Sequence, residues 1–296
     1  MDLQEGARAV LDELCRQREE GVEAVYLEEE TLVGLQSALG SSEGVETVAV
    51  IPEAKPEPQP RPKPIASAKA PTPSSPAAAL PAPPVVNLPE GDKETRRNWL
   101  RDLVLACPTC NENLNANAKV VFGVGAVDAE IFFCGEAPGA DEEMAGEPFV
   151  GPAGQLLDKV VGAMGLTREK VYIGNVMNWR PQHEQAFGNR PPSDEEMEFC
   201  MPYLRAQVKV VEPKVIVALG RTATNGLLQP DPNLKMGDLR GRWWEFEKIP
   251  VMVTYHPSYL LHNPSKVAKR RVWEDLLLVM ERLEMPISEK QRGFFL

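Results

Sequence analysis

The sequence predicts an α/β fold in which helices cover both faces of a central four-stranded parallel sheet, giving three α/β/α layers. The first observation is that four apolar runs have the length of strands: residues 129–134, 171–176, 215–219 and 251–255. The second is that a stretch with helical apolar periodicity follows each run: residues 154–164, 194–211, 222–228 and 265–283. Buried strands that alternate with crossover helices are typical of a parallel sheet covered on both faces.

The composition divides the chain into four segments. Residues 1–48 contain apolar residues at helical spacing and are predicted to form a small helical N-terminal segment. Residues 49–91 are rich in proline and alanine, and because proline lacks an amide donor and restricts φ, we expect a disordered linker. Residues 92–286 hold the predicted α/β domain, and residues 287–296 form a tail.

The bulk composition is that of a globular protein, with 43% hydrophobic and 25% charged residues. No apolar stretch approaches the roughly 18–20 residues of a membrane span, and the N-terminus lacks the features of a secretory signal. We therefore expect a cytoplasmic, monomeric protein with no membrane partner. The net charge is −11, but the first 90 residues hold 15 acidic and 7 basic residues, and the remainder holds 28 and 25. The predicted domain is nearly neutral, so its charge does not exclude a nucleic-acid partner.

Four polar or glycine-rich loops follow the predicted strands, at residues 135–143, 175–190, 220–221 and 256–261. The carboxyl ends of parallel strands share one edge of the sheet, where open α/β folds bind their ligands. The pattern predicts that these loops converge on one site.

The first of these loops, GEAPGADEE, combines a tight turn with several carboxylates. Two glycines and a proline favour an exposed backbone turn with amides available to a ligand. An ordinary strand-to-helix turn with acidic capping residues is an equal alternative. A phosphate cradle fits less well, because the carboxylates would repel an anion. Acid–base work on a neutral or cationic substrate fits better.

His256 follows the fourth predicted strand, in the sequence His256-Pro257-Ser258. A structural histidine is the conservative interpretation, but its position at the same sheet edge as Glu136 favours a functional role. Leu260 and Leu261 come next, and the predicted helix that follows carries Lys269, Arg270 and Arg271.

These apolar and basic residues suit a wedge inserted into duplex DNA with basic groups on the phosphates. The alternative, that the leucines belong to the core and the basic run is a solvated helix face, has equal weight.

Five cysteines, at positions 15, 107, 110, 134 and 200, are an odd number for a disulfide framework. Metal or cluster ligation is therefore the first use to consider.

The ordered set of motifs resembles the type 4 uracil-DNA glycosylases. The motifs that carry the resemblance are 135–143 (GEAPGADEE), 148–151 (PFVG), 153–157 (AGQLL), 171–176 (VYIGNV) and 255–261 (YHPSYLL). Each motif alone is weak, whereas the ordered set, covering roughly residues 107–283, is specific.

The resemblance implies roles for the residues of these motifs. Glu136, together with Glu142, would orient the attacking water or stabilise the cationic sugar. Phe149 would stack on the flipped uracil, Asn175 would pair with its edge, and His256 would donate to uracil O2. The remaining positions that the resemblance assigns to substrate binding are Ala137, Pro138, Gly139, Asn189 and Ser258. Leu260 and Leu261 would fill the gap left in the base stack.

The resemblance also implies a 4Fe–4S cluster on four cysteines, and the sequence departs from that pattern. Cys107, Cys110 and Cys200 match three ligand positions, but Trp179 stands at the other one. Three hypotheses follow: the cluster is lost, it persists with His183 as the fourth ligand, or the same residues bind zinc. Some bound metal centre is slightly favoured, since the retained spacing has no other evident use.

The implied reaction is monofunctional excision of uracil from DNA. The enzyme extrudes the base and hydrolyses its N-glycosidic bond through an oxocarbenium-like state, leaving an abasic site. One alternative is a member of the same superfamily that binds lesions with altered catalysis. Another is an unrelated nucleotide-binding α/β enzyme, although the phosphate-loop and dinucleotide glycine fingerprints are absent from the sequence. A further hypothesis is that the N-terminal segment binds a replication or repair protein.

Overall fold

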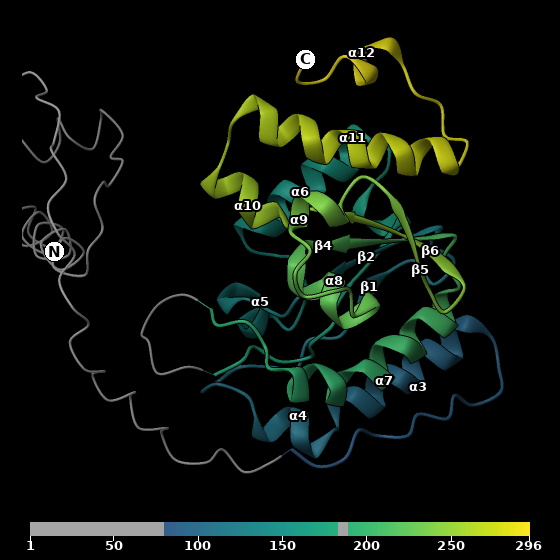
Figure 1. The fold of residues 1–296 in the computed structure, drawn as a ribbon. Helices are drawn as coiled ribbons and strands as arrows, with labels where there is room; N and C mark the ends of the chain where they lie inside the picture. The colour runs from purple at the N-terminus through teal and green to yellow at the C-terminus, as the bar shows by residue number, and fades with distance from the viewer. Residues whose placement is uncertain (1–79, 183–188) are drawn as a thin grey trace, which may run out of the picture. The chain divides into compact units, whose positions relative to one another are not determined.

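The computed structural model describes residues 80–182 and 189–296 (Figure 1). Contacts divide the chain into two units, Met1–Pro71 and Thr72–Leu296, and every residue described here belongs to the second unit. The predicted helical segment 1–48, residues 49–79 of the predicted linker, and His183 lie outside the described residues.

The second unit is built on a six-stranded sheet with strand order β1-β3-β2-β4-β6-β5. Its four central strands are parallel to one another: β3 (Tyr172–Asn175), β2 (Ile131–Gly135), β4 (Val215–Leu219) and β6 (Ile249–Thr254). These are the four strands that the apolar runs predict.

The central four-stranded parallel sheet is as predicted, and each of its edges carries an added antiparallel strand that the sequence did not indicate. At one edge β1 (Val124–Gly125) pairs with β3, and at the other β5 (Trp243–Phe246) pairs with β6. A two-residue strand is too short to show a period. The β5–β6 hairpin turns at Glu247 and Lys248, both with positive φ. Asparagine or glycine usually marks such a turn, and neither is present here.

Helices cover both faces of the sheet, as predicted (Figure 1). In chain order the helical elements are α3 (Lys93–Leu105), α4 (Pro108–Glu112), α5 (Ala140–Ala145), α6 (Pro152–Ala163), the 3₁₀ turn η1 (Arg168–Lys170), α7 (Asp194–Val211), α8 (Gly220–Leu228), α9 (Met236–Leu239), α10 (Pro257–His262), α11 (Lys266–Arg282) and α12 (Glu289–Arg292). Side chains of α3 and α7 share one buried core cluster with one face of the sheet, and side chains of α6 and α11 share the other. Alternate strand residues point to opposite faces, which explains why the strands are apolar at nearly every position.

Both ends of the described unit are packed rather than free. In residues 80–91, the last part of the predicted linker, Leu80, Val86 and Leu88 pack on the core without forming regular structure. In the predicted tail, the Trp273 indole donates to the Gln291 carbonyl at 2.6 Å, and the rings of Trp273 and Phe294 lie 5.2 Å apart. Scattered apolar side chains have no period, so the sequence pattern did not indicate this packing.

None of the helices in the described ranges combines the length and the apolar content that a bilayer crossing requires.

The start of α6 fixes the position of Phe149. A side chain at Gly154 would place its Cβ 1.9 Å from the Phe149 carbonyl oxygen, so only glycine permits this approach. Phe149 itself has a φ of 55°, which a bulky residue adopts only where its surroundings impose it.

We expect Gly154→Ala to lower the free energy of unfolding by about 1–3 kcal/mol, because the added methyl group must displace the backbone at Phe149. Gly162→Ala in the same helix is the matched control, since its Cβ would meet nothing within 4 Å. That variant should be neutral or up to about 1 kcal/mol more stable, owing to the higher helix propensity of alanine. Urea denaturation measures both, and equal stability of the two variants would contradict this account.

Candidate active site

Three residues from distant parts of the sequence meet beside Gly135, at the carboxyl edge of the sheet. Gly135 ends β2 and is paired in register with Asn175 at the end of β3. A Cβ at Gly135 would lie 2.4 Å from Asn175 Oδ1 and 2.5 Å from Phe149 Cζ. The Phe149 ring centre lies 5.6 Å from that of His256. The structure therefore brings Phe149, Asn175 and His256 together. Asn175 and His256 belong to loops that the sequence predicts to converge, whereas Phe149 was indicated only by the family resemblance.

Asn175 carries a buried acceptor without a partner. Its side chain is 6% exposed, and Oδ1 accepts no hydrogen bond. Leaving a buried polar atom unsatisfied costs about 1–3 kcal/mol, so such an atom needs an explanation. A ligand N–H placed against Oδ1 would remove this cost.

His256 is held as a neutral donor. It caps the N-terminus of α10, where its Nδ1 accepts from the Ser258 amide at 3.2 Å and lies 2.8 Å from Ser258 Oγ. Because Nδ1 accepts, the ring proton belongs on Nε2. Burial lowers the pKa of His256 to about 4. The imidazole is thus uncharged near neutral pH, with one N–H available to a ligand.

The backbone around His256 is kept close to the next helix by a glycine. Gly220, the first residue of α8, has a φ of +91°, and a Cβ there would lie 2.9 Å from His256 Cβ. The approach brings α8 to the site, and its Thr222 hydroxyl hydrogen-bonds to the Glu136 side chain.

The two candidate carboxylates have different surroundings. Glu136 is half-buried; burial raises its pKa, and the Thr222 hydrogen bond partly opposes this rise. Glu142 is 9% exposed, and its oxygens accept from the amides of Gly139 (3.1 Å), Val150 (3.0 Å) and Gly151 (2.9 Å). Glu142 is committed to backbone amides on both sides of Phe149, which favours a role in holding the loops, and its expected contact with water stays a prediction.

The other residues of the first loop are arranged around the Glu142 carboxylate. Pro138 is buried, and Ala137 packs on the core. Asn189 is exposed and accepts from Arg180 Nε at 2.7 Å, and its Nδ2 lies 4.0 Å from where a Gly139 Cβ would be. Asn189 therefore borders the loop through Arg180.

Sequence reasoning missed Thr222 and two further residues of the site, Arg180 and Glu143. Arg180 and Glu143 form a largely buried ion pair at 2.8 Å, and Glu143 also accepts from Asn115 at 2.7 Å. The pair joins α5 to the loop after β3. Only the polarity of that loop hinted at it.

The expected DNA-contacting residues separate into two groups. Leu260 is 6% exposed and belongs to the core, so its assignment as an intercalating residue is wrong, whereas Leu261 is 44% exposed. Arg270 donates to Glu274 at 2.9 Å and to the carbonyls of Arg292 (2.8 Å) and Phe294 (2.9 Å). The guanidinium of Arg270 is thus bound by carbonyls of the C-terminal segment. This finding corrects the expected contact of Arg270 with DNA phosphates.

The other two basic candidates differ in exposure. Arg271 is exposed on α11, and Lys269 is half-buried. They are the basic candidates that stay near the predicted wedge.

The cysteine region lacks the fourth ligand that a cluster needs. Cys107, Cys110 and Cys200 are buried, and the Cys110 amide lies 3.5 Å from Cys107 Sγ. Burial, followed by the nearby Cys200 and Cys107, raises the pKa of Cys110. Trp179 is fully buried and packs edge-on against Phe199, with ring centres 6.0 Å apart.

In the part of the chain that the structure describes, no group of three or more histidine, cysteine, aspartate or glutamate side chains is arranged to hold a metal ion. The described residues therefore do not fit a four-thiolate cluster, because an indole, which cannot bind iron, stands at the sequence position of the missing thiol and is buried in the same core cluster as the three cysteines. Cys134 lies in β2 within the core.

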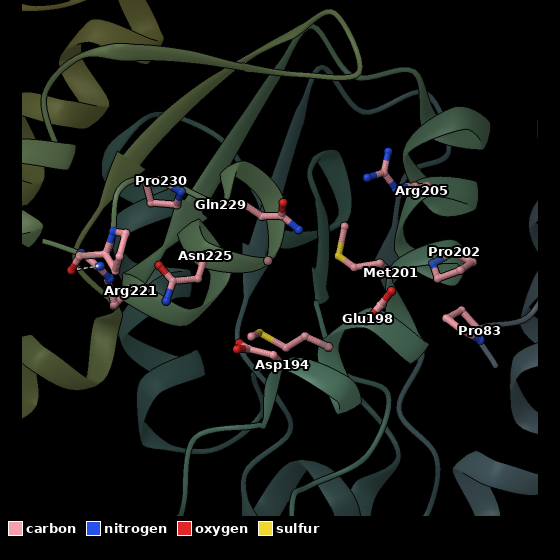
Figure 2. A pocket seen from close by; sticks show the side chains of 13 residues that line it. Pro83, Asp194, Glu198, Met201, Pro202, Arg205, Arg221, Asn225, Gln229 and Pro230 are labelled. Carbon is pink, nitrogen blue, oxygen red and sulfur yellow. Dashed lines mark hydrogen bonds between the residues drawn. The ribbon is translucent and has the colours of Figure 1, made fainter. Parts of the chain in front are cut away.

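A cavity of about 750 Å³ lies next to α7 and α8 (Figure 2). Met197, Met201, Asn225 and Gln229 are among its lining residues, and none of the predicted site residues lines it. Its volume alone does not make it the site, since the unpaired acceptor, the neutral donor and the half-buried carboxylate all lie at the sheet edge.

We expect NMR titration to give His256 a pKa of about 4, assigned by comparison with His256→Ala. In the unfolded chain the group titrates near its ordinary value of 6.5 and binds the proton more readily than in the folded state. Its contribution to stability is complete above pH 6.5 and is lost as the pH falls towards 4. A His256 pKa of 6.5 or higher would contradict the buried neutral state.

We expect Trp179→Cys to complete a four-thiolate set. After anaerobic treatment with iron and sulfide, that variant should gain the visible absorption of an iron–sulfur cluster, and neither wild type nor Trp179→Ser should gain it. Elemental analysis of the purified wild type provides the second measurement. Stoichiometric iron or zinc that disappears in His183→Ala would overturn this expectation in favour of His183 as the fourth ligand.

Comparisons with known proteins agree with this geometry. Residues 122–277 match the Uracil DNA glycosylase superfamily. The type-4 uracil-DNA glycosylase of Thermotoga maritima is 41% identical over 187 residues, covering 62% of this chain and 93% of the relative. The type-4 enzyme of Archaeoglobus fulgidus is 40% identical over 171 residues, covering 54% and 81%. That of Saccharolobus solfataricus is 38% identical over 192 residues, covering 62% and 85%. With its site and its sequence in agreement, the chain belongs to the type-4 uracil-DNA glycosylases of the uracil-DNA glycosylase superfamily.

Proposed function

We propose that this chain is a uracil-DNA glycosylase that hydrolyses the N-glycosidic bond of uracil flipped out of DNA. The products are free uracil and an abasic site, as in base excision repair. Type-4 relatives at about 40% identity support this function.

The observation that carries the proposal is the unpaired Oδ1 of Asn175. The pairing edge of uracil presents one N–H between two carbonyl oxygens, so N3–H can donate to Oδ1 while the amide nitrogen donates to O4. Cytosine presents an acceptor at N3 and a donor at its amino group, which would leave both partners mismatched. Phe149 supplies the ring face on which the base stacks, since it is buried beside both Asn175 and His256.

The neutral His256 suits the departure of uracil. When the bond between N1 and C1′ breaks, the electron pair leaves with uracil, and negative charge grows on its oxygens. A preorganised N–H, here Nε2–H aimed at O2, stabilises this charge without giving up a formal proton. The low pKa of His256 keeps the group in this state across the neutral range.

Glu136 suits the other half of the reaction. Its carboxylate can stabilise the cationic sugar and orient the water whose oxygen bonds to C1′ and which releases a proton. Water, rather than an amine, is the nucleophile in this scheme, so the enzyme is monofunctional. No step uses a metal ion.

The DNA itself is bound beside α10. Leu261 is exposed at the end of this helix and can fill the gap left by the flipped base, and Arg271 and Lys269 can contact the phosphates. Extruding a base from a duplex costs a few kcal/mol, which such a wedge offsets.

We expect His256→Ala to lower kcat by about 10²–10³-fold on an oligonucleotide with a single uracil, because one donor to the leaving group is lost. Alkali cleavage of the abasic product measures the rate. His262→Ala is the matched control, since His262 is exposed on the same helix. An inactive wild type on single- and double-stranded substrates, or equal rates for both histidine variants, would sink the proposal.

A further inference from the structure

A buried ion pair lies beneath the segment that carries His256 and Leu261. Asp275 of α11 is 0% exposed and accepts from Arg240 Nε (3.0 Å), Arg240 Nη2 (2.8 Å) and the Thr254 hydroxyl (2.6 Å). Together these bonds join two other parts of the chain to α11, since Thr254 ends β6 and Arg240 follows α9. Stability alone is a weak explanation for a buried ion pair, because proteins in which apolar residues replace such a pair are often equally stable.

The pair contacts the start of the catalytic segment by two routes. Thr254 lies two residues before His256, so its hydroxyl bond to Asp275 fixes where the segment leaves the sheet. Arg240 lies over the Tyr255 ring at 5.9 Å, and Tyr255 stacks on Tyr259 of α10 at 4.4 Å. Arg240 also donates to the Arg271 carbonyl of α11.

The helix that this arrangement supports cannot set its own orientation. α10 has six residues, fewer than an independently stable helix needs, so packing decides its direction. Its buried residues are Pro257 and Leu260, and its Tyr259 stacks on Tyr255, whose ring lies against Arg240. Leu261 projects from the end of this short helix.

We propose that Asp275 and Arg240 are positioning residues that hold α10 so that Leu261 can enter duplex DNA while His256 faces the uracil. The proposal rests on the glycosylase function above and adds the elements that aim the wedge. Neither residue touches the substrate. Their effect passes through Thr254, where the segment leaves β6, and through the Tyr255–Tyr259 stack, which reaches α10.

This role has a consequence that a purely structural role lacks. A wedge is needed where a base must be pulled from a stacked duplex, and it contributes little on a single strand whose bases are already accessible. Loosening the pair should therefore reduce excision from a duplex far more than excision from a single strand.

The test measures kcat/KM on a uracil-containing single strand and on the same strand in a duplex with adenine opposite the uracil. We expect Asp275→Asn and Arg240→Gln to lower the duplex value about tenfold or more, and the single-strand value less than about threefold. Arg240→Lys keeps the charge and should recover part of the duplex activity. Thr254→Val removes the hydrogen bond between β6 and Asp275 but keeps the ion pair. It therefore separates the effect of that bond from the effect of the contact between Arg240 and Tyr255.

A double-mutant cycle with Leu261→Ala tests whether the effect passes through the wedge. Once Leu261 is removed, Asp275→Asn should change the duplex-to-single-strand ratio little, because the two changes act on one process. Tyr172→Phe is the stability control: it removes a buried hydrogen bond to Gln207 in the opposite core cluster and should leave the ratio unchanged.

Equal losses on both substrates, or additive effects with Leu261→Ala, would overturn the positioning role while leaving the glycosylase function intact. Thermal unfolding shows which variants are folded, and if Asp275→Asn is not, Thr254→Val and Arg240→Lys carry the same comparison. An inactive wild type on the single strand would instead overturn the proposed function itself.

Discussion

The site depends on one carboxylate that binds three backbone amides. Glu142 accepts from Gly139 on one side of the pocket and from Val150 and Gly151 on the other, so it ties the turn after β2 to the start of α6. Hydrogen bonds from amides to a charged acceptor are among the stronger ones in proteins. Between these anchor points lies Phe149, held at a positive φ against Gly154. This connection links the first loop to the segment that holds Phe149 beside Asn175 and His256.

The remaining polar groups divide the chemistry by their surroundings. Burial keeps His256 uncharged and raises the pKa of Glu136. A neutral donor faces the group that gains negative charge, and a carboxylate is available to the sugar that gains positive charge. The net negative charge of the whole chain has no bearing on these roles of His256 and Glu136, because much of that charge comes from residues 1–90.

The sequence predicted the parallel core well, because strands buried on both faces produce long apolar runs. The edge strands escaped prediction: β1 is too short, and the β5–β6 turn lacks its usual residues. Within the site, a motif could place Glu136 and Glu142 in one loop, but only the hydrogen bonds of Glu142 separate their roles. Leu260 and Leu261 are adjacent in sequence, and one lies in the core while the other is exposed, because neighbouring helical residues point about 100° apart.

Contacts between distant segments were beyond any local pattern. The C-terminal carbonyls that bind Arg270, the Arg240–Asp275 pair and the packing of Trp179 on Phe199 all depend on the assembled fold. The tryptophan was visible in the sequence as a departure from the family. That its indole is fully buried, in the same core cluster as the three thiols, became clear only in the structure.

We propose that the unpaired Asn175 Oδ1 recognises uracil by accepting a hydrogen bond from its N3–H. The most direct test of this proposal is the affinity of the protein for single strands that differ in one base, uracil or cytosine, each carrying a 2′-fluorine that slows cleavage. Fluorescence anisotropy should show uracil bound at least about tenfold more tightly, because cytosine leaves buried polar groups unpaired, and Asn175→Leu should abolish the difference. Equal affinity of the wild type for both strands would contradict the account.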